Sequence, residues 1–120
     1  MGQKPEKILI IDDQYGVRAL LTLALNKYDT REAVDGRQAL ETLKSWEPDL
    51  IITDMKMPGL TGLELIDNIK EMNIDSKILL MTAYDDNVPA DVTDISGFIS
   101  KPFDLEKLIL LVEEIINNQA

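Results

Sequence analysis

Residues 7–13 read KILIIDD. The four consecutive apolar residues from Ile8 to Ile11 do not alternate with polar ones, a pattern typical of a short strand buried on both faces of a parallel sheet. The run ends abruptly at Asp12 and Asp13. Open parallel sheets bind ligands outside the carboxyl ends of their strands, so this pair of aspartates indicates a functional edge as well as a fold class.

The same change from an apolar run to an amphipathic segment recurs along the rest of the chain. Further strands are predicted at residues 28–34, 50–53, 77–82 and 98–100. Amphipathic helices are predicted at residues 14–27, 39–46, 63–72 and 105–116, the last one capped by Asp104. Residues 83–96 are polar and only faintly periodic, so we expect a short or irregular helix there.

Five strands that alternate with helices predict an α/β fold, namely one doubly wound, five-stranded parallel sheet with helices on both faces. The 120 residues, 45% of them hydrophobic, suit one core of ordinary size. We therefore expect a single domain over residues 1–120, with its core at about residues 6–118 and no output domain.

The composition excludes several classes of function. The formal net charge of −10 and the absence of a basic run disfavour nucleic acid as a partner. The chain has no cysteine and no histidine, which excludes disulfides, thiol nucleophiles and sites built on imidazole. No segment resembles a signal peptide or approaches the roughly 20 apolar residues of a membrane span, so we expect a cytoplasmic protein.

Polar residues also follow the ends of the other predicted strands. Asp54 follows the third strand, Thr82 closes the fourth and Lys101 follows the fifth. If the first and third strands are neighbours, Asp54 joins Asp12 and Asp13 at one edge, where three carboxylates repel one another unless a cation is present. Magnesium suits such a site because it binds a few carboxylate or carbonyl oxygens and accepts phosphate oxygens. The set predicts phosphoryl transfer with Asp54 as the nucleophile.

Each of these residues also has a simpler interpretation. Paired aspartates at a strand end are often turn formers or helix caps. Lys101, which precedes a proline, is compatible with an ordinary solvated side chain, and Thr82 with an ordinary strand terminus. Only their joint placement at successive strand ends favours the phosphoryl-transfer site.

Four short motifs, in this order, resemble the receiver domain of bacterial two-component response regulators, and the resemblance covers essentially the whole chain. The motifs are Ile10-Ile11-Asp12-Asp13, Ile52-Thr53-Asp54-Met55-Lys56-Met57-Pro58-Gly59, Met81-Thr82-Ala83 and Ser100-Lys101-Pro102-Phe103. The resemblance implies a flavodoxin-like sheet with strand order 2-1-3-4-5. It also implies a phosphoacceptor rather than a conventional enzyme, one that promotes its own magnesium-dependent phosphorylation and slow dephosphorylation.

The resemblance assigns roles at the acidic edge. It implies that Asp54 is phosphorylated. It further implies that Asp13, Asp54 and the main-chain carbonyl of Lys56 hold Mg²⁺ directly, with Mn²⁺ able to substitute. Asp12 would contribute to the same metal site through a water molecule.

Switching residues are implied in the same way. Thr82 would reach the phosphoryl group in the activated state, Lys101 would pair with it, and the Lys101-Pro102 peptide bond would be cis. Phe98 occupies the family's switch-aromatic position, although an aromatic residue on a short strand is equally compatible with the core. Tyr84 is the candidate for gating access to the site.

Within the family, Asp13-Gln14-Tyr15-Gly16 together with Lys56 most resembles the single-domain phosphorelay intermediate of spore-forming bacteria. That resemblance implies a sporulation relay that takes a phosphoryl group from a histidine kinase and passes it to a histidine phosphotransferase, with a phosphatase as a further partner. The alternative is a diffusible output switch of chemotaxis type whose phosphorylated form binds an effector protein. The sequence does not separate the two, because both need the same site.

A surface for these partners is expected on the first helix and on the loops beside the site. The expected residues are Gln14, Tyr15, Arg18, Pro58, Pro102 and Phe103. Tyr15, Ala19 and Leu23 form a second apolar stripe on the first helix, compatible with a docked helix or with scattered exposed apolar residues. We expect a monomer, and the apolar Leu110 and Leu111 leave weak dimerisation as the alternative.

Two features depart from the family's usual pattern. Thr82 and Lys101 are only nineteen positions apart, a few fewer than the family usually has, which is why the helix between them is expected to be short or irregular. No glycine separates the first helix from Tyr28, so Asn26 is the candidate for the left-handed residue that ends that helix.

Overall fold

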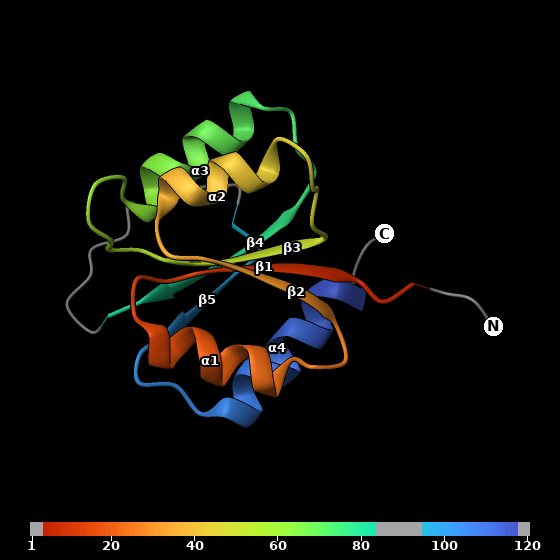
Figure 1. Cartoon of the computed structure of the whole chain (residues 1–120). Helices are drawn as coiled ribbons and strands as arrows, with labels where there is room; N and C mark the ends of the chain where they lie inside the picture. The colour runs from red at the N-terminus through yellow and green to blue at the C-terminus, as the bar shows by residue number, and fades with distance from the viewer. Residues whose placement is uncertain (1–3, 84–94, 118–120) are drawn as a thin grey trace.

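A computed structural model describes residues 4–83 and 95–117 and shows a sheet between two layers of helices (Figure 1). In chain order the elements are β1 (Lys7–Ile11), α1 (Tyr15–Ala24), β2 (Asp29–Ala33), α2 (Gly36–Leu43), β3 (Leu50–Asp54), α3 (Gly62–Glu71), β4 (Lys77–Thr82), β5 (Gly97–Ser100) and α4 (Leu105–Asn117). The strands are parallel and in the order β2-β1-β3-β4-β5, which confirms the predicted fold. Most of the segment predicted to hold an irregular helix, including Tyr84, lies outside the described residues.

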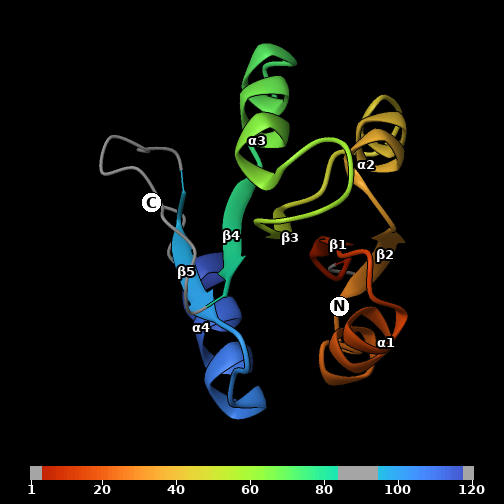
Figure 2. The same ribbon diagram turned by 90° about the vertical axis from the view of Figure 1, so that its left-hand side faces the viewer.

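The central position of β1 brings the acidic residues to one edge. Ile11 pairs with Ala33 of β2 on one side and with Thr53 of β3 on the other. Asp12 and Asp54 each follow that row of residues, so both lie at the carboxyl edge of the sheet. Figure 2 looks onto this edge and shows the strands side by side in their spatial order.

Helices cover both faces of the sheet, as predicted. α2 and α3 lie on one face, and α1 and α4 lie on the other (Figure 1). Leu9 and Ile11 of β1 pack in the core under α2 and α3, whereas Ile8 and Ile10 pack in the core under α1 and α4. Both faces of β1 are therefore buried, which explains why its sequence does not alternate. None of the described helices is long and apolar enough to cross a membrane.

Three helices begin at side chains that satisfy free main-chain N–H groups. The side chain of Asp35 caps α2. Thr61 and Glu64 form a reciprocal capping box at the start of α3. Asp104 accepts a hydrogen bond from the main-chain N–H of Glu106 at 2.9 Å, which confirms the predicted cap of α4.

The end of α1 differs from the prediction. The helix ends at residue 24, three residues earlier than predicted. Asn26 is not left-handed, because Asn73 (φ 59°), after α3, is the single non-glycine residue with positive φ in the described part of the chain. The chain leaves α1 through a turn in which the N–H of Tyr28 donates to the carbonyl of Leu25 at 3.0 Å, and this turn needs no left-handed residue.

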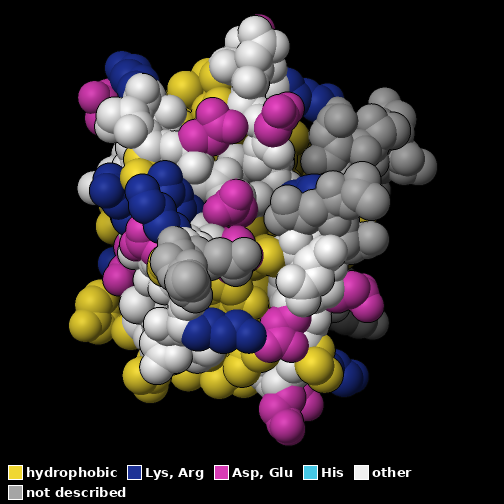
Figure 3. Space-filling view, turned by 90° about the vertical axis from the view of Figure 1, so that its right-hand side faces the viewer, with side chains coloured by type: hydrophobic (Ala, Val, Ile, Leu, Met, Phe, Trp, Pro, Cys, Tyr) yellow, Lys and Arg dark blue, Asp and Glu magenta, His cyan; other side chains and the backbone are white. Residues whose placement is uncertain are grey.

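The amino ends of the strands face the viewer in Figure 3, where acidic and basic side chains are interspersed. At this end of the sheet the cationic side chains of Arg31 and Lys7 lie near the ring of Trp46. The Arg31 guanidinium carbon lies 4.5 Å from the ring centre and Lys7 Nζ lies 5.8 Å from it. The acidic residues that converge are found at the opposite end.

Candidate phosphoryl-acceptor and metal site

Three carboxylates meet at the carboxyl edge of the sheet. Asp12 and Asp13 follow β1, and Asp54 is the last residue of β3. One oxygen from each carboxylate lies within 4.8 Å of the others. Asp12 is fully buried, Asp54 is largely buried and Asp13 is exposed. The convergence expected from the strand order is therefore present.

Asp12 is held on every side by hydrogen bonds. Its Oδ1 accepts from the main-chain N–H of Gln14 at 2.8 Å, and its Oδ2 accepts from Lys101 Nζ at 2.7 Å. Its main-chain N–H donates to the carbonyl of Ala33 on β2 at 3.1 Å. Its own carbonyl accepts from the guanidinium of Arg18 at 2.7 Å. Because a buried carboxylate is costly without such partners, this network offsets the cost of burying the Asp12 side chain.

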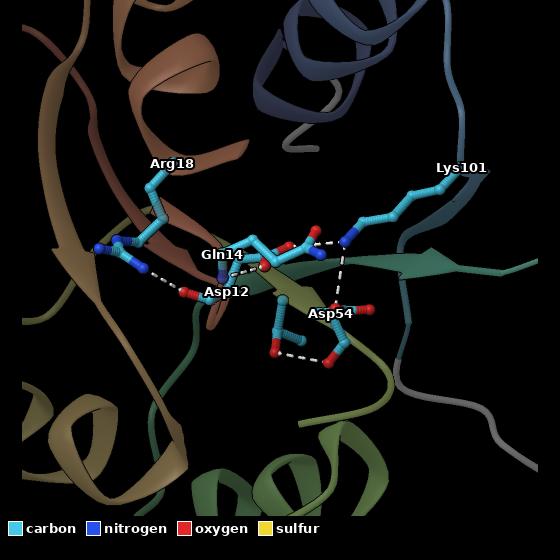
Figure 4. A network of polar contacts seen from close by, with 6 residues as sticks. Asp12, Gln14, Arg18, Asp54 and Lys101 are labelled. Atoms are coloured by element: carbon cyan, nitrogen blue, oxygen red, sulfur yellow. Dashed lines mark hydrogen bonds and ion pairs between the residues drawn. The ribbon is translucent and has the colours of Figure 1, made fainter. Parts of the chain in front are cut away.

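Lys101 bridges two of the carboxylates (Figure 4). Its ammonium lies 2.7 Å from Asp12 and 3.1 Å from Asp54, and 21% of its side-chain surface is exposed. Its main-chain N–H donates to the carbonyl of Thr82 at 2.7 Å, and the peptide bond to Pro102 is cis, as the family resemblance implies. The lysine is therefore an ordered part of the site and not a solvated side chain.

Burial and the charges at this edge shift the pKa values of Asp54 and Lys101. Burial raises the pKa of Asp54 above its ordinary 3.8, and the nearby Asp12 charge adds to that shift, while the hydrogen bond and charge of Lys101 oppose it. Burial alone would lower the pKa of Lys101, but its hydrogen bonds to Asp12 and Asp54 outweigh burial and raise the pKa above 10.5. Lys101 therefore stays protonated at neutral pH, and it favours the ionised form of Asp54 that a nucleophile requires.

The loop after Asp54 is fastened at both of its ends. The N–H of Met55 donates to the carbonyl of Met81 on β4 at 2.9 Å, and the N–H of Gly62 donates back to the carbonyl of Met55 at 2.8 Å. A Cβ at Gly62 would lie 2.5 Å from the Asp54 carbonyl oxygen, so only glycine lets α3 approach this peptide so closely. Lys56 is exposed, and a main-chain hydrogen bond from it lowers the pKa of the Asp54 carboxyl.

Thr82 ends β4 at the same edge. The register pairs Asp54 with Met81, so Thr82 comes one residue beyond the acceptor along the neighbouring strand. Its side chain is partly exposed, and its partner on β5 is Ser100. The threonine hydroxyl is thus on a strand that borders the acceptor.

The donor atoms at this edge suit a hard divalent cation. The ligands within reach are carboxylate and carbonyl oxygens, which Mg²⁺ and Mn²⁺ bind, and the chain has no thiolate or imidazole that would favour a softer metal. Both oxygens of Asp12 are already hydrogen-bonded, whereas Asp13 is exposed. The acidic cluster of Asp12, Asp13 and Asp54 therefore fits a site for a hard divalent cation such as Mg²⁺.

The predicted switch and partner residues have unequal exposure. Phe98 is 49% exposed, which disfavours the alternative of a core residue, and its role as a switch residue stays a prediction. Tyr15 and Leu23 are 74% and 71% exposed, and Leu20 of the same helix is 46% exposed and widens this apolar face. Among the loop residues, Gln14, Pro58 and Pro102 are exposed and Phe103 is partly buried against the core.

Arg18 was predicted to lie on the partner surface, and the structure corrects this. The residue is only 8% exposed and its guanidinium contacts Asp12 and Glu32. A sequence signal for the contact with Asp12 was available, because Arg18 lies in the first turn of the helix that follows this strand end. Glu32 and Gly62 were also missed, since no local pattern reveals that Glu32 contacts the Arg18 side chain or that Gly62 packs against the main chain of Asp54 and Met55.

Comparisons with known proteins agree with this geometry. The profile of the family described as response regulator receiver domain matches residues 8–113. The chain is 39% identical to the sporulation initiation phosphotransferase F of Bacillus subtilis over 108 residues, which cover 86% of this chain and 87% of that relative. It is 36% identical to the response regulator MprA of Mycolicibacterium vanbaalenii, covering 88% of this chain but only about half (48%) of that longer relative.

Solved structures share the fold. The signal receiver domain of an HD domain-containing protein from Pseudomonas fluorescens Pf-5 superimposes with a TM-score of 0.88 at 28% identity, and 98% of each chain is covered.

Proposed function

This chain belongs to the response regulator receiver domain family, and from that premise we propose that it carries phosphoaspartate signals by accepting a phosphoryl group on Asp54. One observation carries the choice of residue. Lys101 Nζ contacts the Asp54 carboxylate at 3.1 Å while Asp12 holds the lysine from the other side at 2.7 Å. Asp54 is therefore the carboxylate that combines partial exposure, a bound cation and a position at the carboxyl end of a central strand.

The proposed reaction is a transfer between a phosphohistidine and an aspartate. A carboxylate oxygen of Asp54 attacks phosphorus, an O–P bond forms and the N–P bond to the donor imidazole breaks. Lys101 neutralises charge on the phosphoryl oxygens, and the hydroxyl of Thr82 donates a hydrogen bond to one of them. A magnesium ion held by Asp13, Asp54 and the Lys56 carbonyl would supply further neutralisation of the same oxygens.

Within this role we propose the phosphorelay intermediate. The protein would receive the group from a histidine kinase, pass it to a histidine phosphotransferase and be reset by a phosphatase. Support comes from the likeness to the sporulation initiation phosphotransferase F and from the exposed apolar side chains of Tyr15, Leu20 and Leu23 on α1 beside the site. Such a face suits an amphipathic partner helix. We also propose that this relay operates in the cytoplasm.

The test is phosphoryl uptake from a labelled histidine kinase in the presence of Mg²⁺. The native protein should label and Asp54→Asn should not, because the amide is not a nucleophile for this reaction. Asp67→Asn is the matched control, since Asp67 is an exposed aspartate on α3 outside the site, and it should label like the native protein. Absence of label in the native protein with a competent kinase would disprove the assignment of Asp54.

Addition of a histidine phosphotransferase separates the relay from the alternative output switch. Rapid movement of the label from Asp54 to the phosphotransferase is expected for a relay. Label that stays on Asp54 in the presence of a phosphotransferase that accepts it from another receiver would favour the diffusible switch.

A further inference from the structure

Arg18 is the only buried cation among residues 4–83 and 95–117. Its Nε donates to Glu32 Oε1 at 3.0 Å, and one terminal nitrogen donates to the carbonyl oxygen of Asp12 at 2.7 Å. A guanidinium taken out of water is costly unless it gains partners of this kind. No step of the proposed reaction uses this residue, so its burial calls for another explanation.

The two cations reach Asp12 from opposite sides. Figure 4 shows Arg18 approaching the main-chain carbonyl on one side while Lys101 approaches the carboxylate on the other. The Asp12 main chain is thereby fixed between Arg18 and Ala33, and its carboxylate is left to hold Lys101 beside Asp54. A shift of the Asp12 main chain would move the lysine that contacts the acceptor.

Glu32 fixes Arg18 in turn. Glu32 lies on β2, where it pairs with Ile10, two rows before Asp12, and its second oxygen accepts from the hydroxyl of Thr22 on α1 at 3.4 Å. The side chain of Arg18 is therefore held by an anion of the neighbouring strand, and this strand already binds the N–H of Asp12. The planar guanidinium reaches both partners at once, which the single ammonium of a lysine does less well.

We propose that Arg18, held by Glu32, is a positioning residue that fixes Asp12 so that Lys101 and the metal ligands keep their places around Asp54. The inference rests on the proposed function of Asp54. It assigns Arg18 a role within the protein, in contrast to the role in partner docking expected from the sequence. Tyr15, whose ring lies 5.8 Å from the Arg18 guanidinium carbon and is exposed, remains available to a partner.

The experiment compares Arg18→Met, Glu32→Ala and their double variant with the native protein. Two readouts need no protein partner: the affinity for Mg²⁺ by titration calorimetry, and the rate at which Asp54 is labelled by acetyl phosphate. Removing a residue that supports a metal ligand typically weakens metal affinity by about tenfold or more, and we expect a loss of that size for Arg18→Met together with slower labelling. Glu32→Ala should lose less, and the double variant should lose no more than Arg18→Met alone.

Glu113→Ala is the matched control. Glu113 also forms an ion pair with a residue of another segment, at 2.7 Å from Lys27, and its side chain is 35% exposed compared with 39% for Glu32. That pair joins the turn after α1 to α4, away from the acidic edge. Its removal should leave both Mg²⁺ affinity and labelling unchanged.

Two outcomes would overturn the proposal. Native Mg²⁺ affinity and native labelling in a folded Arg18→Met protein would show that the contact is only structural. Native values in both assays with a loss confined to transfer from a kinase would show that Arg18 is a docking residue after all. If Arg18→Met does not fold, Arg18→Lys and Glu32→Ala decide by the same readouts, since Glu32 lies partly exposed at the surface. Failure of the native protein to bind Mg²⁺ or to label would instead count against the proposed function.

Discussion

The Asp54 carboxyl is largely buried, and the ion pair with Lys101 limits the cost of its charge. We predict that Lys101→Met raises the pKa of Asp54 further above 3.8, because burial and the Asp12 charge then act without the opposing cation. The measurement is a pH titration of the Asp54 carboxyl carbon by NMR without divalent cations. A carboxyl whose pKa is raised on folding binds its proton more tightly in the folded state. Its charge therefore destabilises the fold above that pKa, and this cost disappears as the pH falls through it. An unchanged or lower pKa in the variant would contradict the bridging role.

Gly62 has no room for a side chain. A Cβ there would lie 2.5 Å from the Asp54 carbonyl oxygen and 2.9 Å from Met55 Cα, and main-chain atoms cannot move aside cheaply. We predict that Gly62→Ala destabilises the protein by about 1–3 kcal/mol, as overpacking does. It should also slow labelling by acetyl phosphate more than tenfold, since misplaced reacting atoms are costly (roughly 10²-fold per ångström).

Gly16→Ala is the matched control for that substitution. A Cβ at Gly16 meets nothing within 4 Å, and the residue lies in α1, where alanine is favoured over glycine by roughly 0.5–1 kcal/mol. Urea unfolding and labelling should show a protein at least as stable as native and equally reactive. Equal loss of reactivity in both alanine variants would show that the close approach of Gly62 does not matter.

At the scale of elements, the first turn of α3 rests on the peptide that follows the acceptor. The capping box joins Thr61 and Glu64, and the next residue after Thr61 is hydrogen-bonded to Met55. We predict that Thr61→Ala costs about 1 kcal/mol, typical of a lost helix cap, and also slows labelling of Asp54. Asp35→Ala removes the cap of α2 at similar cost but should leave labelling unchanged. Equal labelling rates in Thr61→Ala and Asp35→Ala would show that the start of α3 does not position the acceptor.

Considered over the whole molecule, the carboxylates of Asp12, Asp13 and Asp54 repel one another, and a bound cation reduces this repulsion. One oxygen from each of the three carboxylates lies within 4.8 Å of the others, and Lys101 forms ion pairs with two of them, Asp12 and Asp54. We predict that Mg²⁺ raises the unfolding free energy by about 2.7 kcal/mol at one hundred times its dissociation constant, the value that mass action gives for one site. Thermal unfolding with and without Mg²⁺ measures this. Asp13→Asn should lose most of the gain, and full retention of the gain in that variant would place the ion elsewhere.

Much of the architecture was readable from local pattern. The unbroken run from Ile8 to Ile11 indicated burial on both faces, and the aspartates after it marked the carboxyl edge. These signals depend on neighbouring residues in the chain, so periodicity and turn chemistry reveal them. The carboxyl end of α1 and the burial of Arg18 were not readable, because hydrophobicity alone predicts that an arginine on a helix is exposed.

Apolar runs and polar strand ends are local properties, so the amino-acid sequence alone indicated the fold class, the family and the residues that could converge. The contacts of the site became visible only in the folded molecule: Lys101 lies between Asp12 and Asp54, Arg18 is buried behind Asp12, and Gly62 packs against the main chain of the acceptor. The physical reason is that each of these contacts joins segments brought together by strand order and packing. Their energies depend on distance and burial, which no single stretch of the chain encodes.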